Sequence, residues 1–160
     1  MEQKNGEHPF SDLGQLICAG LFLVVWAGDS FILRRSTFLS NDISLSIRLV
    51  ILGFAIFTAA NLFKSGHVVV SHEGQPNHVV STRAFRYVRH PLYLASILTY
   101  LGLTISTMSL FSLVLLVGIF IFHNYIASYE EKLLEARFGE EYRSYKKKTG
   151  KWMPRISDER

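Results

Sequence analysis

The chain has 160 residues, of which 49% are hydrophobic, and its formal net charge is +4. The charges are unevenly placed, because the apolar stretches at residues 13–33, 43–63 and 91–127 hold very few of them. This composition excludes an ordinary soluble globule and predicts a single-domain, all-α bundle that crosses a membrane several times.

The first two apolar stretches have the length of membrane-spanning helices. Residues 13–33 would form a helix of about 32 Å, close to the thickness of a bilayer core. Arg34 and Arg35 end this stretch, and the second follows at residues 43–63. The leader, residues 1–12, lacks the basic start of a secretory signal, so we keep residues 13–33 as a span.

Two charged residues, Asp29 and Arg48, lie inside these spans at a similar distance from the connecting loop. An isolated charge in a span is costly, whereas two opposite charges at similar depth can pair. We therefore expect an Asp29–Arg48 ion pair that locks the first hairpin. A role in a functional site and exposure at the membrane interface are the alternatives.

The longest polar connection, residues 64–90, separates the second apolar stretch from the third. Val68–Val70 predict a short extended piece, and the Gly and Pro that follow predict a turn. Pro91 suits the first position of a helix, where its missing N–H costs nothing. Residues 91–127 are too long for one span and break at residues 106–109, which predicts spans near 91–107 and 109–127.

The chain changes character at Tyr129. Apolar and aromatic residues then recur every three to four positions among charged ones, which predicts an amphipathic helix on or just outside the membrane. Gly139 breaks this helix. With four spans, most lysines and arginines fall on one side and only Arg34 and Arg35 on the other. The positive-inside rule then places both termini and the polar connection in the cytoplasm.

A cationic and aromatic stretch, Phe85–Tyr93, lies at the start of the third apolar run and would share a membrane face with Glu130 and Glu131. Arginines and the helix beginning at Pro91 favour an anion, and the aromatic rings favour a planar group or a cation. The two carboxylates could hold an ammonium or ribose hydroxyls. S-adenosylmethionine carries all of these groups.

The ordered motifs of the second half resemble the isoprenylcysteine carboxyl methyltransferase and phospholipid methyltransferase superfamily. The matching pieces are Arg89-His90-Pro91-Leu92-Tyr93, Glu130-Glu131, Phe138-Gly139-x-x-Tyr142-x-x-Tyr145 and Lys151-Trp152-Met153-Pro154. The resemblance covers roughly residues 77–154 and implies an integral membrane methyltransferase that uses S-adenosylmethionine within a helical, non-Rossmann fold.

The resemblance also implies site residues. The cofactor would be bound by Asn77, His78, Val79, Val80, Phe85, His90, Pro91, Leu92, Tyr93, Glu130 and Glu131. Beyond the resemblance, we expect Arg89 and His90 to be catalytic and His123 and Asn124 to contact the methyl acceptor.

The sequence departs from the family pattern at three places. Arg83 stands where members often have glycine, and Phe85 stands where they often have tyrosine. Ile126 and Ala127 occupy the region in which the eukaryotic prenylcysteine enzymes carry a basic residue. The acceptor is therefore left as a lipophilic molecule, either isoprenylcysteine-carboxylate-like or an amino-lipid, with a small thiol as the alternative.

Other interpretations stay open at this stage. The chain could be a non-enzymatic membrane scaffold or a small transporter that kept the fold. The arginines of residues 86–89 could only anchor lipid headgroups, Glu130-Glu131 could be a solvated helix face, and His123 could bond to a neighbouring carbonyl. The histidines at 67, 72 and 78 have no cysteine partner, so we expect no metal, and nothing indicates a nucleic-acid partner.

Overall fold

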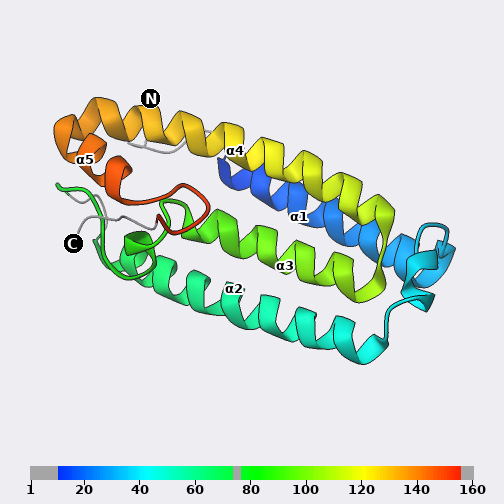
Figure 1. Cartoon of the computed structure of the whole chain (residues 1–160). Coiled ribbons are helices and arrows are strands. Elements are labelled where there is room, and N and C mark those ends of the chain that lie inside the picture. Colours follow the sequence, from blue (N-terminus) through cyan, green and yellow to red (C-terminus); the bar gives the residue numbers. More distant parts are fainter. Residues whose placement is uncertain (1–10, 74–76, 156–160) are drawn as a thin grey trace.

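The computed structural model describes residues 11–73 and 77–155, and side chains within residues 13–67 and 77–155. The predicted leader lies mostly outside the described residues. In this part of the chain four long helices lie side by side and a short fifth folds back at one end (Figure 1). Their bounds are α1 Ser11–Ala27, α2 Leu45–Glu73, α3 Pro91–Thr107, α4 Leu110–Phe138 and α5 Glu140–Lys148.

The order of the helices across the bundle differs from their order in the chain. α3 packs against α2 on one side and against α4 on the other, while α1 packs mainly against α4. The α2–α3 contact is close because Gly102 lacks a side chain, since an added Cβ would lie 2.9 Å from the Cβ of Ala55. Small residues therefore set this helix spacing, as is common in membranes.

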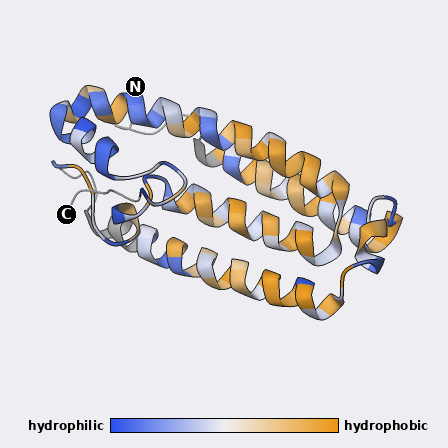
Figure 2. Cartoon of the chain, viewed as in Figure 1, coloured by the Kyte–Doolittle hydropathy of each residue, from blue (hydrophilic) through white to orange (hydrophobic). Residues whose placement is uncertain are grey.

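The surface of the bundle is apolar along most of its length. Hydropathy is high over the long helices and low at the end that carries α5 and at the loop between α1 and α2 (Figure 2). Several large apolar side chains are well exposed, as expected for a surface that faces lipid. They include Leu16, Val24, Ile32, Val50, Phe54 and Val114.

Three helices of the described residues are long and apolar enough to cross a membrane: Leu13–Leu33, Leu45–His67 and Leu110–Phe138. Together with the bundle they confirm the predicted all-α membrane fold. α3 is a shorter apolar helix of 17 residues. The fourth span, at residues 91–107, therefore stays a prediction.

Two predicted boundaries were wrong. The extended piece at Val68–Val70 is helical, because α2 continues to Glu73. The amphipathic helix expected to start at Tyr129 is not separate, because α4 runs without a break to Phe138. At Val68–Val70 a helix that is already formed propagates through residues whose own helix preference is weak, whereas the residues that follow Tyr129 include many strong helix formers and simply continue α4.

The predicted turns at residues 106–109 and at Gly139 are confirmed. Met108 takes a left-handed conformation, with φ of 56°, and Ser109 caps α4 by accepting a hydrogen bond from the amide of Ser112. Gly139 also has positive φ, 55°, which glycine adopts readily. This turn lets α5 fold back beside the end of α4 (Figure 1).

The predicted Asp29–Arg48 ion pair is wrong. Arg48 donates hydrogen bonds to the carbonyls of Ile43 and Ser106. The buried Asp29 carboxylate accepts hydrogen bonds from the hydroxyls of Ser36 and Ser109 and from two backbone amides, those of Arg35 and Ser36. Uncharged donors from the following loop and from the α3–α4 turn thus satisfy this carboxylate.

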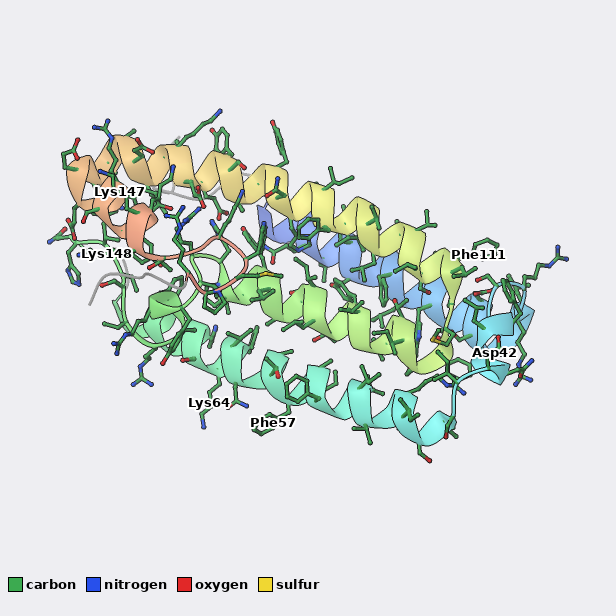
Figure 3. The ribbon with its side chains drawn as sticks, viewed as in Figure 1. Asp42, Phe57, Lys64, Phe111, Lys147 and Lys148 are labelled. Carbon is green, nitrogen blue, oxygen red and sulfur yellow. The ribbon has the colours of Figure 1, made fainter. Side chains whose placement is uncertain are left out.

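The two ends of the bundle carry different side chains (Figure 3). Asp42 and Phe111 lie at the end with the α1–α2 loop, whereas Lys147 and Lys148 lie on α5 at the other end. Phe57 and Lys64 project from α2 away from the other helices. The predicted site residues lie near the α5 end.

Candidate active site

The candidate site is assembled from three segments that are far apart in the sequence. A short 3-10 helix, η3 (Arg83–Arg86), leads into Arg89 and His90, and Pro91 then starts α3 at its first position. The charged end of α4 supplies Glu130 and Glu131. The C-terminal strap, defined here as residues 149–155, follows α5 and returns to the same place.

Glu131 is the centre of the charged cluster. Its Oε1 accepts a hydrogen bond from Nε of Arg89 at 2.8 Å and lies 3.2 Å from Nε2 of His90. Its Oε2 lies 3.8 Å from Nζ of Lys146. The side chains of Glu131 and Arg89 are only 9% and 11% exposed, so this ion pair is largely removed from water. The structure thus joins Arg89 and His90 to one half of the predicted acidic pair.

His90 is buried, and burial lowers the pKa of its imidazole, although the hydrogen bond with Glu131 acts in the opposite direction. The ring is therefore neutral near pH 7. A neutral ring that donates from Nε2 to Glu131 keeps an acceptor lone pair at Nδ1. This Nδ1 lies 3.8 Å from Oε2 of Glu130.

Tyr93 links His90 to the other carboxylate. Its hydroxyl donates to Oε1 of Glu130 at 2.5 Å, and its ring stacks on the His90 imidazole with centroids 5.7 Å apart. Trp152 lies near the imidazole as well, at 5.9 Å. Two aromatic faces and two carboxylates therefore surround one neutral histidine.

The structure separates His123 from Asn124. His123 is 1% exposed, donates from Nδ1 to the carbonyl of Ile119 at 2.8 Å, and meets the Tyr93 ring edge-on at 5.3 Å. Its Nε2 has no hydrogen-bond partner among the described residues. The hydrogen bond to the carbonyl of Ile119 agrees with a purely structural role for His123. Its buried Nε2 atom, which has no partner among the described residues, is not explained by that role.

Asn124 faces the C-terminal strap. Its Oδ1 accepts hydrogen bonds from Nζ of Lys151 at 2.9 Å and from Nε1 of Trp152 at 3.1 Å. Lys151 also donates to the hydroxyl of Ser128. Asn124 therefore anchors the strap to α4.

The strap also holds Arg89, which sequence reasoning did not foresee. The amide of Arg89 donates to the carbonyl of Gly150 at 2.9 Å, and Val88 and Gly150 form a parallel bridge. The Arg89 guanidinium donates to the carbonyls of Lys146 and Thr149. The sequence signal was the terminal Lys151-Trp152-x-Pro154 motif, which carried no assigned role.

The upstream segment predicted to line the cofactor borders a separate small pocket of about 90 Å³ that shares Arg89 with the charged cluster. The amide of Val79 donates to Oε1 of Glu141 at 2.8 Å, which ties this segment to α5. Asn77 is exposed and does not line the pocket. The lining residues are His78, Val79, Val80, Phe85, Arg89, Leu134, Phe138, Tyr142 and Tyr145.

Two further residues predicted to bind the cofactor lie elsewhere. Pro91 is fully buried at the start of α3. Leu92 packs toward α2, where a Cβ added to Gly66 would lie 3.0 Å from its Cδ2. Their neighbours His90 and Tyr93 face α4 instead, through the bonds to Glu131 and Glu130.

The chain matches one family model, described as phospholipid methyltransferase, over residues 43–141. This range includes α2, α3, α4 and the start of α5, and with them both halves of the charged cluster. Comparisons with curated proteins and with solved structures found no match.

Proposed function

Because the chain belongs to the phospholipid methyltransferase family, we propose that it transfers a methyl group from S-adenosylmethionine to a lipophilic acceptor in the membrane. The family and the apolar helices support a membrane methyltransferase that acts on lipid-like substrates. The cofactor, the acceptor class (an amino-lipid or an isoprenylcysteine-carboxylate-like molecule) and the site residues are the proposal. One domain carries both parts, with cofactor binding in residues 77–154.

The observation that carries this proposal is the buried cluster of Glu130, Glu131, Arg89 and His90 around the Tyr93 ring. Its donor set fits S-adenosylmethionine. Carboxylates suit the ammonium and ribose hydroxyls, and aromatic faces suit the sulfonium through cation–π attraction. The neighbouring pocket of about 90 Å³ has an apolar lining that suits part of a flat ring.

The cofactor supplies a methyl group on a sulfonium, which is a good leaving group. The protein then mainly has to position the reactants and exclude water. Glu131 holds His90 in one orientation, and Arg89 holds Glu131. Tyr93 orients Glu130 in the same way. Burial of the cluster keeps these charged groups in a site of low dielectric, where they act more strongly.

The acceptor would enter sideways from the lipid. A groove of about 330 Å³ between α2 and α3 is open toward the outside of the bundle and starts near Ala95, two residues beyond Tyr93. It is lined by Ile56, Ala59, Ala60, Phe63, Ala95, Ser96, Thr99 and Tyr100. This lining is mostly apolar and suits an acyl or prenyl chain.

The nature of the acceptor decides whether a base is needed. A carboxylate attacks directly, whereas an ammonium must first lose a proton. The Nε2 atom of His123 is buried and has no partner among the described residues, and its ring contacts Tyr93. We assign it to the acceptor side of the site, where a neutral Nε2 could accept that proton.

Calorimetry with S-adenosylmethionine on the purified protein in detergent tests the proposal. We expect saturable binding, and transfer of a labelled methyl group to one member of a panel of amino-lipids, prenylcysteine analogues and small thiols. His90→Ala should weaken cofactor binding, whereas His67→Ala, at an exposed position of α2 outside the cluster and the small pocket, should leave it unchanged. Folded protein that shows no binding at high micromolar cofactor would refute the enzyme and leave a scaffold.

The orientation is part of the same proposal. Lys147 and Lys148 of α5 lie at the site end (Figure 3), so the positive-inside rule puts this end in the cytoplasm. Labelling of an introduced cysteine at position 148 in intact cells and in inverted vesicles would test it. We expect labelling by an impermeant reagent only in inverted vesicles.

A further inference from the structure

A second, larger pocket lies between the last turns of the α2 span and η3. Its volume is about 420 Å³, and it shares no residue with the charged cluster or with the groove between α2 and α3. It is lined by Thr58, Asn61, Leu62, Ser65, Arg83, Ala84, Arg86 and Tyr87. Hydroxyl, amide and guanidinium groups thus face one hollow at the polar end of α2.

The charge of this pocket is one-sided. Arg83 and Arg86 are exposed, and in the described part of the chain neither forms an ion pair, in contrast to Arg89 with Glu131. No carboxylate lines the pocket. Two guanidinium groups without an acidic partner attract an anion, and the planar fork of arginine matches phosphate oxygens well.

The backbone at Arg83 adds an independent argument. Arg83 has φ of 51°, in the left-handed region that costs a residue with a Cβ roughly 1 kcal/mol and costs glycine almost nothing. The strained conformation is thus occupied by a residue whose side chain lines a basic pocket.

The helix below the pocket carries an apolar stripe. Ile47, Ile51 and Phe54 lie at spacings of four and three residues, and Thr58, Leu62 and Ser65 continue the same spacing up to the pocket. The exposed fractions of the three apolar side chains are 55%, 40% and 72%. The stripe therefore runs from lipid-facing apolar surface, through hydroxyls, to the arginines.

We propose that this pocket binds the phosphate of an anionic phospholipid of the surrounding membrane, with one acyl chain running down the same face of α2 as far as Phe54. The phosphate is held by Arg83 and Arg86 at the level where the apolar span ends. A zwitterionic lipid is disfavoured, because its ammonium would lie beside two cations with no carboxylate in the lining. The site is separate from the proposed methyl-transfer centre and depends only on the protein being in a membrane.

Arg83→Gly is the decisive variant, because it relieves the backbone strain while it removes the guanidinium. Arg34→Gly is a matched control, because Arg34 is also exposed and left-handed, with φ of 49°, but lies at the other end of the bundle. Thermal unfolding in detergent is measured with added phosphatidic acid, with phosphatidylcholine and with soluble glycerol 3-phosphate. Binding of S-adenosylmethionine is measured on the same samples.

We expect phosphatidic acid to raise the Tm of the wild type and of Arg34→Gly by the same amount. Arg83→Gly should have an unchanged or higher Tm without lipid and should lose at least half of the lipid-induced shift, and Arg86→Gln should lose a similar share. Cofactor binding should be unchanged in all variants, which separates this result from the proposed function. A full shift in Arg83→Gly, or an equal shift with phosphatidylcholine or with glycerol 3-phosphate, would overturn the lipid site.

Discussion

Asp29 and Glu131 are both buried carboxylates, and they lie at opposite ends of the bundle with very different partners. Asp29 accepts hydrogen bonds from two serine hydroxyls and two backbone amides. Glu131 is surrounded by Arg89, His90 and Lys146. One carboxylate is satisfied by neutral donors of the fold, and the other by side chains that can change charge or partner.

This difference separates a structural role from a chemical one. Asp29, which lies just after α1, is bonded to neutral donors in a loop and in the cap of α4. It therefore connects the end of α1 to the α3–α4 turn in one fixed arrangement. Cations on long side chains form a cluster whose charge distribution can respond to a ligand, as is common at functional sites. Substitutions at the two carboxylates should therefore differ in how they change stability and cofactor affinity.

The largest effect is expected for Glu131→Gln. Removing one charge of a buried ion pair costs about 3–5 kcal/mol, because the Arg89 guanidinium is left without its partner. Cofactor affinity should fall at least tenfold as well, since His90 loses its orientation. Thermal unfolding and calorimetry measure the two effects. Glu135→Gln is the control, because Glu135 pairs with Arg143 and Lys146 near the surface, and it should leave both quantities close to the wild type.

Asp29→Asn should lower stability without touching the site. One oxygen is kept for the two amides, but the serine hydroxyls lose a charged acceptor, which costs about 2 kcal/mol. Thermal unfolding should show the loss, and cofactor affinity should match the wild type. Asp42→Asn, at an exposed position of the same end (Figure 3), should change neither. A drop in affinity larger than the drop in stability would place Asp29 in the functional site after all.

A smaller effect is expected for Tyr93→Phe. The ring that stacks on His90 is kept, and only the hydroxyl bond to Glu130 is lost, at a cost of about 1 kcal/mol. If Glu130 needs this bond to be oriented, cofactor affinity should fall more than stability. Tyr125→Phe, at an exposed position of α4, is the matched control. Unchanged affinity in Tyr93→Phe would remove Glu130 from the proposed site.

The smallest effect is a pH dependence confined to the site end. The pKa of His90 is lowered in the folded protein, so the unfolded chain binds a proton more readily. This contribution to stability is fully present above about pH 6.5 and is lost as the pH falls. Burial is the largest cause of the lowered pKa of His90; Glu131 opposes it, Lys151 and Arg89 act in the same direction as burial, and Glu130 also lies near the ring.

A series of Tm measurements between pH 5 and pH 8 tests this dependence. We expect His90→Gln to flatten the decrease below about pH 6.5, whereas His78→Gln at an exposed site should keep it. An identical decrease in His90→Gln would assign the effect to another group.

Much of the bundle was predictable because apolar length and helix breakers are local signals. Pro91 marks the start of α3, and Met108 and Gly139 lie at turns where the pattern changes. The partners of Asp29 were not predictable, since Ser36 and Ser109 carry no pattern that would distinguish them from other serines. Opposite charge in the neighbouring helix favoured Arg48, which instead bonds to backbone carbonyls.

At the site, the compact sequence motifs predicted which residues come together. They did not predict the direction in which each side chain points. His90, Tyr93, Glu130 and Glu131 come together in the structure. Leu92 turns toward α2, because neighbouring residues of a helix point about 100° apart. The sequence did not predict that the chain near the strap contacts Arg89. These hydrogen bonds are accepted by backbone carbonyls, which every residue has, so no residue type marks them in the sequence.

The pairing of Arg89 with Gly150 has a consequence for how the protein matures. The spans can enter the membrane as they are synthesised, but the contacts between Arg89 and the strap form only after residues 149 and 150 have left the ribosome. A chain shortened before residue 149 would therefore insert normally and lack a finished site.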